Sequence, residues 1–228
     1  MAHLALEIQQ LKQEVHAMWG MVLAQLQRSQ RALHAPDPAL VKEVSRQEKR
    51  INTRELKIER HCESIIALHT PVAIDLRFVL AVLKINTSLE RVGDAAKAMA
   101  QFVRRFVLKG EEKFDPHLLA ISRLDEMCRE ATMLLEMVQG AFEHEDSQLA
   151  RRMFREVKAL ADNNVQAHAA LATYIQDHPG QVQQALQILL LVRKLDRIGD
   201  EAKNIAEEII FYLEAQVLRH QSGKHRGQ

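Results

Sequence analysis

Two blocks of the sequence carry a pair of carboxylates at the same spacing. Glu90 and Asp94 stand four residues apart, and Asp196 and Asp200 repeat this spacing later in the chain. Residues four apart share one face of a helix, where two like charges repel by roughly 0.2–0.5 kcal/mol. A cation between the carboxylates would relieve this repulsion, and oxygen ligands suit hard metal ions such as Fe, Mn, Mg or Ca. The pairs are therefore candidate metal ligands.

A further group of oxygen-bearing residues interrupts an apolar pattern earlier in the chain. In the helix expected at 38–68, apolar residues spaced by three and four define a buried face, but two positions of that face hold Glu48 and Glu55. Carboxylates that face a neighbouring helix are costly unless a cation pairs with them. One side of this helix thus carries an oxygen-rich stripe, made up of Glu48, Asn52, Glu55 and Glu59.

The residues themselves leave two interpretations of this stripe open. In the first, nearby basic side chains neutralise the acids and the stripe is a solvated helix face; these basic residues are Lys49, Arg54, Arg91 and Lys97. In the second, carboxylates of facing helices hold a multivalent metal ion, as they do in other helical bundles.

The second half of the chain is poorer in acids at the equivalent places. Val157 and Asn164 occupy the positions that Glu48 and Glu55 hold in the first half. Asp162 is the acidic residue of this segment that we expect to assist Asp196 and Asp200. A second site is therefore expected to bind metal weakly or not at all.

These residues must be positioned by helices. Aromatic residues make up only 4% of the chain, with 8 Gly and 5 Pro, which disfavours strands and tight turns. Asp-Pro or Thr-Pro pairs at 37–38, 70–71 and 115–116 predict N-caps followed by Pro at the first helical position. We expect six long helices, at 4–33, 38–68, 71–108, 117–143, 146–176 and 181–218.

The chain also contains an internal repeat. Residues 89–97 (LERVGDAAK) match residues 195–203 (LDRIGDEAK), and both lie in the third helix of their half. The predicted fold is all-α, with two tandem antiparallel three-helix bundles at 1–110 and 111–220, and residues 221–228 as a flexible tail. Steps of three and four along the helices are typical of such packing.

Charge and motifs exclude several classes of function. The net charge of +1 lacks the basic excess that nucleic-acid binding requires. No apolar run approaches the ~18 residues that span a bilayer. Cys62 and Cys128 are too few for a disulfide scaffold, so a reduced, cytoplasmic protein is expected. No His has Glu three residues before it, which disfavours a di-iron oxygenase centre.

The acidic blocks and the repeated bundles resemble the PhoU family of phosphate-uptake regulators, over roughly residues 3 to 220. The resemblance also includes Asp75-Leu76-Arg77 after Pro71 and the run from Asn204 to Glu207. It implies a cytoplasmic protein, commonly a homodimer, that is not an enzyme. It further implies negative regulation of the phosphate-starvation response, through contacts with a phosphate ABC transporter ATPase and a sensor histidine kinase, so that the membrane is reached only through these partners.

The resemblance also implies multinuclear clusters of iron, zinc or manganese. One cluster would be held by Glu48, Asn52, Glu55, Glu59, Glu90 and Asp94, and the other by Asp162, Asp196 and Asp200. Two rival interpretations remain beside the regulator: a metal-free helical adaptor, and a carboxylate-bridged metalloenzyme such as a two-metal phosphohydrolase.

Overall fold

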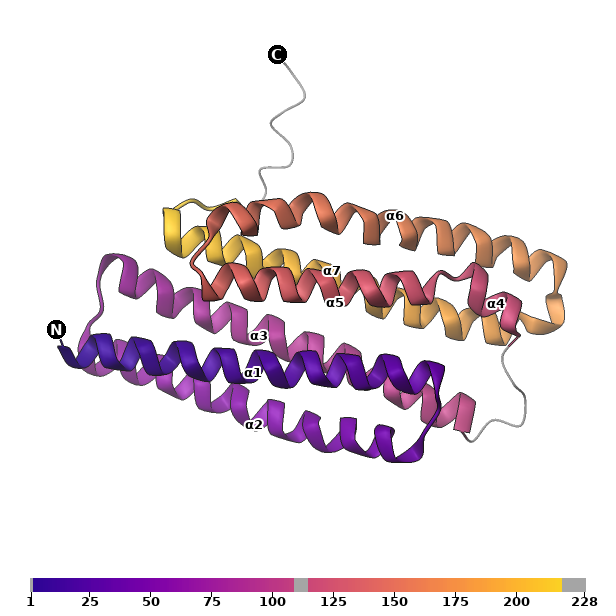
Figure 1. Cartoon of the computed structure of the whole chain (residues 1–228), viewed down its shortest axis with the longest axis horizontal. Coiled ribbons are helices and arrows are strands. Elements are labelled where there is room, and N and C mark those ends of the chain that lie inside the picture. Colours follow the sequence, from indigo (N-terminus) through magenta and orange to yellow (C-terminus); the bar gives the residue numbers. More distant parts are fainter. Residues whose placement is uncertain (1, 109–114, 219–228) are drawn as a thin grey trace, which may run out of the picture.

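The computed structural model describes residues 2–108 and 115–218, and within these ranges it contains helices and no strand. This confirms the all-α prediction (Figure 1). The α-helices are α1 (Ala2–His34), α2 (Pro38–His69), α3 (Ala73–Phe102), α4 (Pro116–Ile121), α5 (Leu124–Glu143), α6 (Ser147–Asp177) and α7 (Val182–Glu214). A π-helical segment, η1 (Val103–Leu108), extends α3, and a 3₁₀ turn, η2 (Pro179–Gln181), precedes α7.

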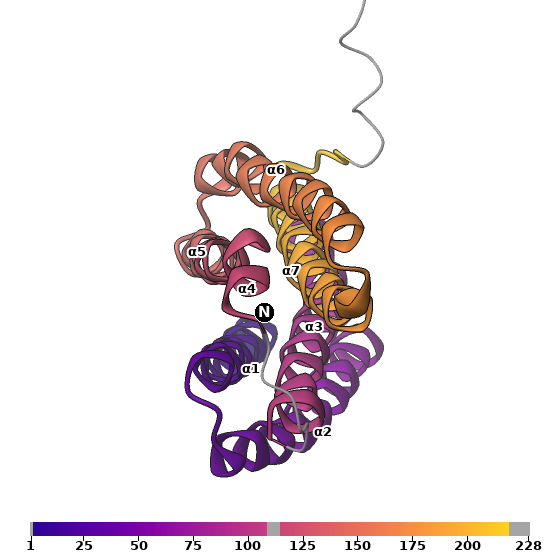
Figure 2. The ribbon, with the colours of Figure 1, turned by 90° about the vertical axis from the view of Figure 1, so that its right-hand side faces the viewer.

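The long helices form two three-helix groups, as predicted. Figure 2 shows α1, α2 and α3 in one group and α5, α6 and α7 in the other. The groups meet where α3 packs along α7 and α1 packs along α5. Helices α3 and α7 run antiparallel, because Arg77 reaches the carbonyl of Tyr212 whereas Lys84 reaches Glu208, nearer the start of α7.

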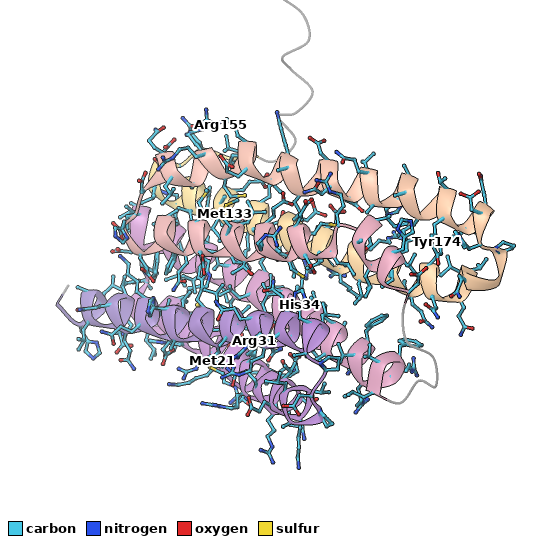
Figure 3. All side chains as sticks on the ribbon, turned by 45° about the vertical axis from the view of Figure 1, so that its right-hand side comes forward. Met21, Arg31, His34, Met133, Arg155 and Tyr174 are labelled. Atoms are coloured by element: carbon cyan, nitrogen blue, oxygen red, sulfur yellow. The ribbon has the colours of Figure 1, made fainter. Side chains whose placement is uncertain are left out.

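The buried residues of both groups belong to one continuous core, and side chains fill the spaces between the helices (Figure 3). An aromatic cluster joins four helices at its centre. The indole of Trp19 lies 5.8 Å from the Phe142 ring, and Phe78 meets Tyr212 edge-on at 5.4 Å. Trp19 is fully buried, and its Nε1–H donates to the Leu135 carbonyl at 3.3 Å. Trp19 is therefore part of the hydrophobic core.

The substitution Trp19→Phe is expected to lower the free energy of unfolding by about 1–3 kcal/mol, because it removes one buried hydrogen bond and leaves a cavity between α1 and α5. Denaturant unfolding followed by far-UV circular dichroism measures the change. Leu6→Ala is the matched control, since Leu6 is 61% exposed on the same helix and should change stability by less than about 0.5 kcal/mol. Equal effects of the two substitutions would contradict the assignment of Trp19 as a core anchor.

The predicted helix ends are confirmed in part. The side chain of Asp37 accepts from Ala39 N at 2.8 Å, and Asp115 accepts from His117 N at 2.9 Å, so both act as N-caps before Pro. The prediction that Thr70 is an N-cap is wrong. Thr70 is the C-cap of α2, in the left-handed conformation at φ 43°, and α3 begins only at Ala73. A Pro after Thr70 is equally compatible with a helix that has just ended.

The helix predicted at 117–143 is interrupted. Arg123 adopts φ 54° and separates α4 from α5, a break that no Gly or Pro announces. Two other predictions, the boundary between the bundles at 110 and 111 and the tail at 221–228, lie outside the described residues. Cys62 and Cys128 are both buried free thiols, whose burial raises the pKa of each to about 12.

Candidate metal centre

Three predicted ligands meet between α2 and α3. Glu48, Glu90 and Asp94 each offer a carboxylate oxygen, and the three oxygens lie within 4.8 Å of one another. Glu48 is the innermost of them, with only 3% of its side chain exposed. Its place on the apolar face of α2, between Val44 and Ile51, forces this burial, as the sequence pattern predicted.

Close packing of the helices brings these carboxylates together. Gly93 of α3 faces Ile51 of α2 beside Glu48, at a distance where an added Cβ would make an ordinary van der Waals contact of 3.4 Å. Gln25 of α1 completes the junction. Its Nε2 donates to Glu48 Oε2 at 2.6 Å and to the Gly93 carbonyl at 2.9 Å. Gln25 thereby fixes the orientation of the buried carboxylate.

One lysine partly neutralises this cluster. Lys97 Nζ lies 3.4 Å from Glu48 and 3.5 Å from Asp94. Arg91, which the solvated-face interpretation also assigned to these acids, pairs with Glu201 of α7 at 3.5 Å, and its charge lowers the pKa of Glu90 as well. Desolvation, followed by the proximity of Asp94, raises the pKa of both Glu48 and Glu90. The carboxylates thus repel one another in a partly desolvated place, which favours either a bound proton or a bound cation.

The remaining residues of the stripe extend the cluster along α2. Burial, and then the charge of Glu90, raises the pKa of Glu55 to about 7, and Glu59 one turn further on adds to this shift. The Asn52 side chain is exposed but near Glu48. With its amide nitrogen toward Glu48, it donates to Oε1 at 3.1 Å. Rotation of the amide by 180° would present its oxygen to a cation instead.

The second bundle repeats the arrangement with weaker ligands. Burial and then the charge of Asp200 raise the pKa of Asp196, whereas His168 and a hydrogen bond from Asn164 lower it. The place of Asn164 opposite Asp196 agrees with its predicted equivalence to Glu55. His168 stands four residues beyond Asn164, as Glu59 does beyond Glu55, so an imidazole replaces a carboxylate here.

The role predicted for Asp162 requires correction. Asp162 is exposed, and it precedes by two residues the Asn164 that faces Asp196. Two residues correspond to about 200° around a helix, so Asp162 points away from Asp196 and Asp200. Asp162 was predicted as a ligand because of its charge. The position of Asp162 in the helical repeat excludes it from the cluster of Asp196 and Asp200.

Both clusters carry oxygen donors of the kind that hard cations prefer. The first brings three carboxylates within 4.8 Å of one another, with the charges of Lys97 and Arg91 beside them. In the second bundle, Asn164 Oδ1 is buried without a hydrogen-bond partner, so an oxygen ligand is available beside Asp196. The neutral Asn and His give the second cluster a smaller negative charge. It is therefore the weaker of the two candidate sites.

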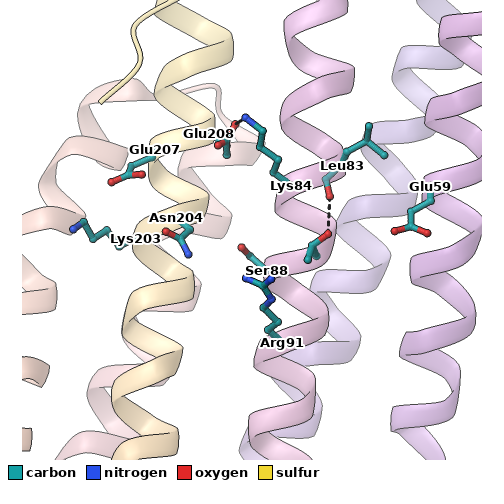
Figure 4. Close-up of a pocket in the computed structure, with 10 residues that line it drawn as sticks. Glu59, Leu83, Lys84, Ser88, Arg91, Lys203, Asn204, Glu207 and Glu208 are labelled. Carbon is teal, nitrogen blue, oxygen red and sulfur yellow. Dashed lines mark hydrogen bonds and ion pairs between the residues drawn. The ribbon is translucent and has the colours of Figure 1, made fainter. Parts of the chain in front are cut away.

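An open groove of about 750 Å³ runs beside the first cluster, between α3 and α7 (Figure 4). Glu59 of α2 lines one side of it, and charged and uncharged residues of α3 and α7 line the rest. Lys84 Nζ crosses it to Glu208 at 3.1 Å. Sequence reasoning did not find this groove, because it depends on how the two bundles pack. None of the helices within 2–108 and 115–218 combines the length and apolar character that a bilayer crossing demands.

Comparison with known proteins now gives these clusters a family context. The family described as the PhoU domain matches the chain twice, at residues 15–103 and 124–209. The phosphate-specific transport system accessory protein PhoU of Escherichia coli (strain K12) is 32% identical over 95% of this chain and 88% of its own length. The PhoU homolog of Caulobacter vibrioides is 31% identical over 96% of this chain and 93% of its own.

A solved structure supports the same assignment. The crystal structure of PhoU from Pseudomonas aeruginosa has a TM-score of 0.85 and 27% identity, and the match covers 93% of this chain and 99% of that one. The two family matches fall on the two bundles, and the first contains Glu90 and Asp94, whereas the second contains Asp196 and Asp200. The chain therefore belongs to the PhoU family.

Proposed function

We propose that this chain is a metal-binding negative regulator of phosphate uptake and of the phosphate-starvation response. The observation that carries the proposal is the carboxylate cluster of Glu48, Glu90 and Asp94, of which Glu48 is buried, in a chain whose relatives are named as accessory proteins of a phosphate-specific transport system. The role is regulatory and not enzymatic. It is exercised in the cytoplasm by a homodimer, through contacts with the ATPase of a phosphate transporter and with a sensor histidine kinase.

The structural part of this proposal concerns the first bundle. Glu48, Asn52, Glu55, Glu90 and Asp94 hold a cluster of iron, manganese or zinc, and Gln25 and Lys97 orient the buried ligand. Glu59, at the edge of the groove, lies where the cluster approaches the surface. The metal neutralises the repelling carboxylates and so stabilises one packing of α2 against α3. That fixed surface is what the partners recognise.

Loss of the gene is expected to make the phosphate-starvation genes constitutive in the organism that encodes this chain. A reporter for those genes should be high in phosphate-replete medium without the gene, and low again when the wild-type gene is returned. The variant Glu90→Gln/Asp94→Asn should fail to restore repression, because it removes two of the carboxylates from the proposed site.

The matched control is Glu63→Gln/Asp177→Asn, which changes two exposed carboxylates outside both clusters and should restore repression fully. Normal repression in the strain without the gene would overturn the regulatory proposal. Full repression by Glu90→Gln/Asp94→Asn, at equal protein abundance, would instead favour the metal-free adaptor.

A further inference from the structure

A second kind of cluster lies at the end of the first bundle, where α1 begins and α2 ends (Figure 1). His3, Glu7 and His69 each offer one ligand atom, and the three atoms lie within 4.8 Å of one another. The rings of His3 and His69 are 5.0 Å apart between centroids. Glu48 precedes His69 by six turns of α2, or about 30 Å along the helix, so this cluster is separate from the carboxylate cluster.

The central carboxylate of this cluster is held in place by residues behind it. Glu7 Oε2 is hydrogen-bonded to His61 Nε2 at 2.9 Å, which leaves Oε1 facing His3 Nδ1 at 3.4 Å. The other ring nitrogen of His61 lies 3.0 Å from Glu14, and Lys57 pairs with that same carboxylate at 2.7 Å. Glu14 is buried, with 8% of its side chain exposed.

This arrangement has two layers, with outer residues that orient an inner ligand. Metal sites in proteins are built this way, because a hydrogen bond to one atom of a ligand directs its other atom at the ion. Glu7 uses one oxygen for His61 and keeps the other for the space between two imidazoles. The hydrogen bond to His61 also lowers the pKa of Glu7.

We propose that His3, Glu7 and His69 form a site for a divalent first-row transition metal ion, with Zn²⁺ as its representative, that ties the start of α1 to the end of α2. Two imidazoles and one carboxylate prefer such ions to Mg²⁺ or Ca²⁺, which select oxygen ligands. Ligand atoms on one Zn²⁺ are about 3.4 Å apart. The side chain of His3 is 71% exposed and can rotate inward to reach that spacing.

The test is a calorimetric titration of Zn²⁺ into the full chain without a polyhistidine tag, in excess Mg²⁺. The parent protein carries Glu90→Gln/Asp94→Asn, so that the first carboxylate cluster does not contribute. We expect His69→Ala, or His3→Ala, to remove one equivalent of bound Zn²⁺ from this parent. The ring-proton NMR signals of His3 and His69 should shift together during the titration of the parent.

Two further variants make the test specific. His16→Ala is the matched control, because His16 lies on α1, is 57% exposed and should not affect the equivalent of Zn²⁺. His61→Gln should weaken binding by about 10–100-fold, as loss of an orienting residue does. Equal Zn²⁺ binding by the parent and His69→Ala, or equal losses from His16→Ala and His69→Ala, would overturn the proposal. Neither result depends on whether the chain regulates phosphate uptake.

Discussion

The substitution pair Glu90→Gln and Asp94→Asn is expected to raise the melting temperature of the metal-free protein and to abolish the rise that metal produces. Two opposite effects follow from one cause. In the metal-free wild type, Glu48, Glu90 and Asp94 repel one another in a partly desolvated place, and Lys97 offsets only part of this repulsion. Removal of two of the charges should stabilise the fold by about 1–2 kcal/mol.

With metal bound, the same carboxylates stabilise the wild type. A ligand present at one hundred times its Kd stabilises a protein by about 2.7 kcal/mol, which for a chain of this size corresponds to a rise of about 5–10 °C in melting temperature. Scanning calorimetry of chelator-treated protein, with and without added Mn²⁺ or Fe²⁺, measures both effects. Elemental analysis of protein purified without chelator then shows which metal the wild type retains and the double variant loses.

Glu63→Gln/Asp177→Asn again serves as the control, because the same number of charges is removed from exposed positions. It should melt within about 1 °C of the wild type in both states. If metal leaves the melting temperature of the wild type unchanged, the cluster is a solvated acidic face. The fold would stand in that case, but the metal-dependent part of the proposed function would not.

The first carboxylate cluster was predictable because its determinants are local. Glu48 occupies a buried position of a helical repeat, so the sequence alone shows that a charge lies inside. The spacing of Glu90 and Asp94 then defines which face of α3 meets it. In the second bundle the same reasoning placed Asn164 at the position that faces Asp196, where its hydrogen bond lowers the pKa of that carboxyl. It failed for Asp162, where charge was given more weight than angular position around the helix.

Other features depend on contacts between distant segments and have no local signal. Gln25 reaches Glu48 and Gly93 only because α1 packs into the groove between α2 and α3. The cluster of His3, Glu7 and His69 joins residues from opposite ends of two helices. The break at Arg123 requires a left-handed residue where neither Gly nor Pro marks it. Such features follow from tertiary packing, which overrides local propensity.

The metal-free protein is expected to become more stable as the pH falls from 8 to 5.5, and Glu55 is expected to cause a measurable part of this gain. Burial and the nearby carboxylates raise the pKa of Glu55 from 4.5 to about 7. Between these two values the folded protein binds a proton that the unfolded chain does not. The free energy of unfolding therefore falls as the pH rises through this window.

The variant Glu55→Gln isolates the contribution of this residue. It should be more stable than the wild type by about 1–2 kcal/mol at pH 8, a value reduced for the partial exposure of Glu55, and by less than about half as much at pH 5.5. All other titratable groups are common to both chains, so their contributions to stability cancel in the difference. Some carboxyl groups, such as those of Glu14 and Asp115, have a pKa below the ordinary values of 4.5 and 3.8. Their effect on stability therefore changes only below these values, outside the range from pH 5.5 to 8.

With metal bound, we expect the wild type to be more stable than Glu55→Gln at pH 8, the opposite of the order in the metal-free protein. A cation held by the cluster keeps Glu55 ionised, so the stability of the metal-loaded wild type should depend less on pH in this window and should exceed that of Glu55→Gln at pH 8. A constant difference between the two metal-free chains from pH 5.5 to 8 would show that Glu55 is exposed to solvent and isolated from Glu90. The stripe on α2 would then end at Asn52, and the candidate centre would consist of Glu48, Glu90 and Asp94 with the amide beside them.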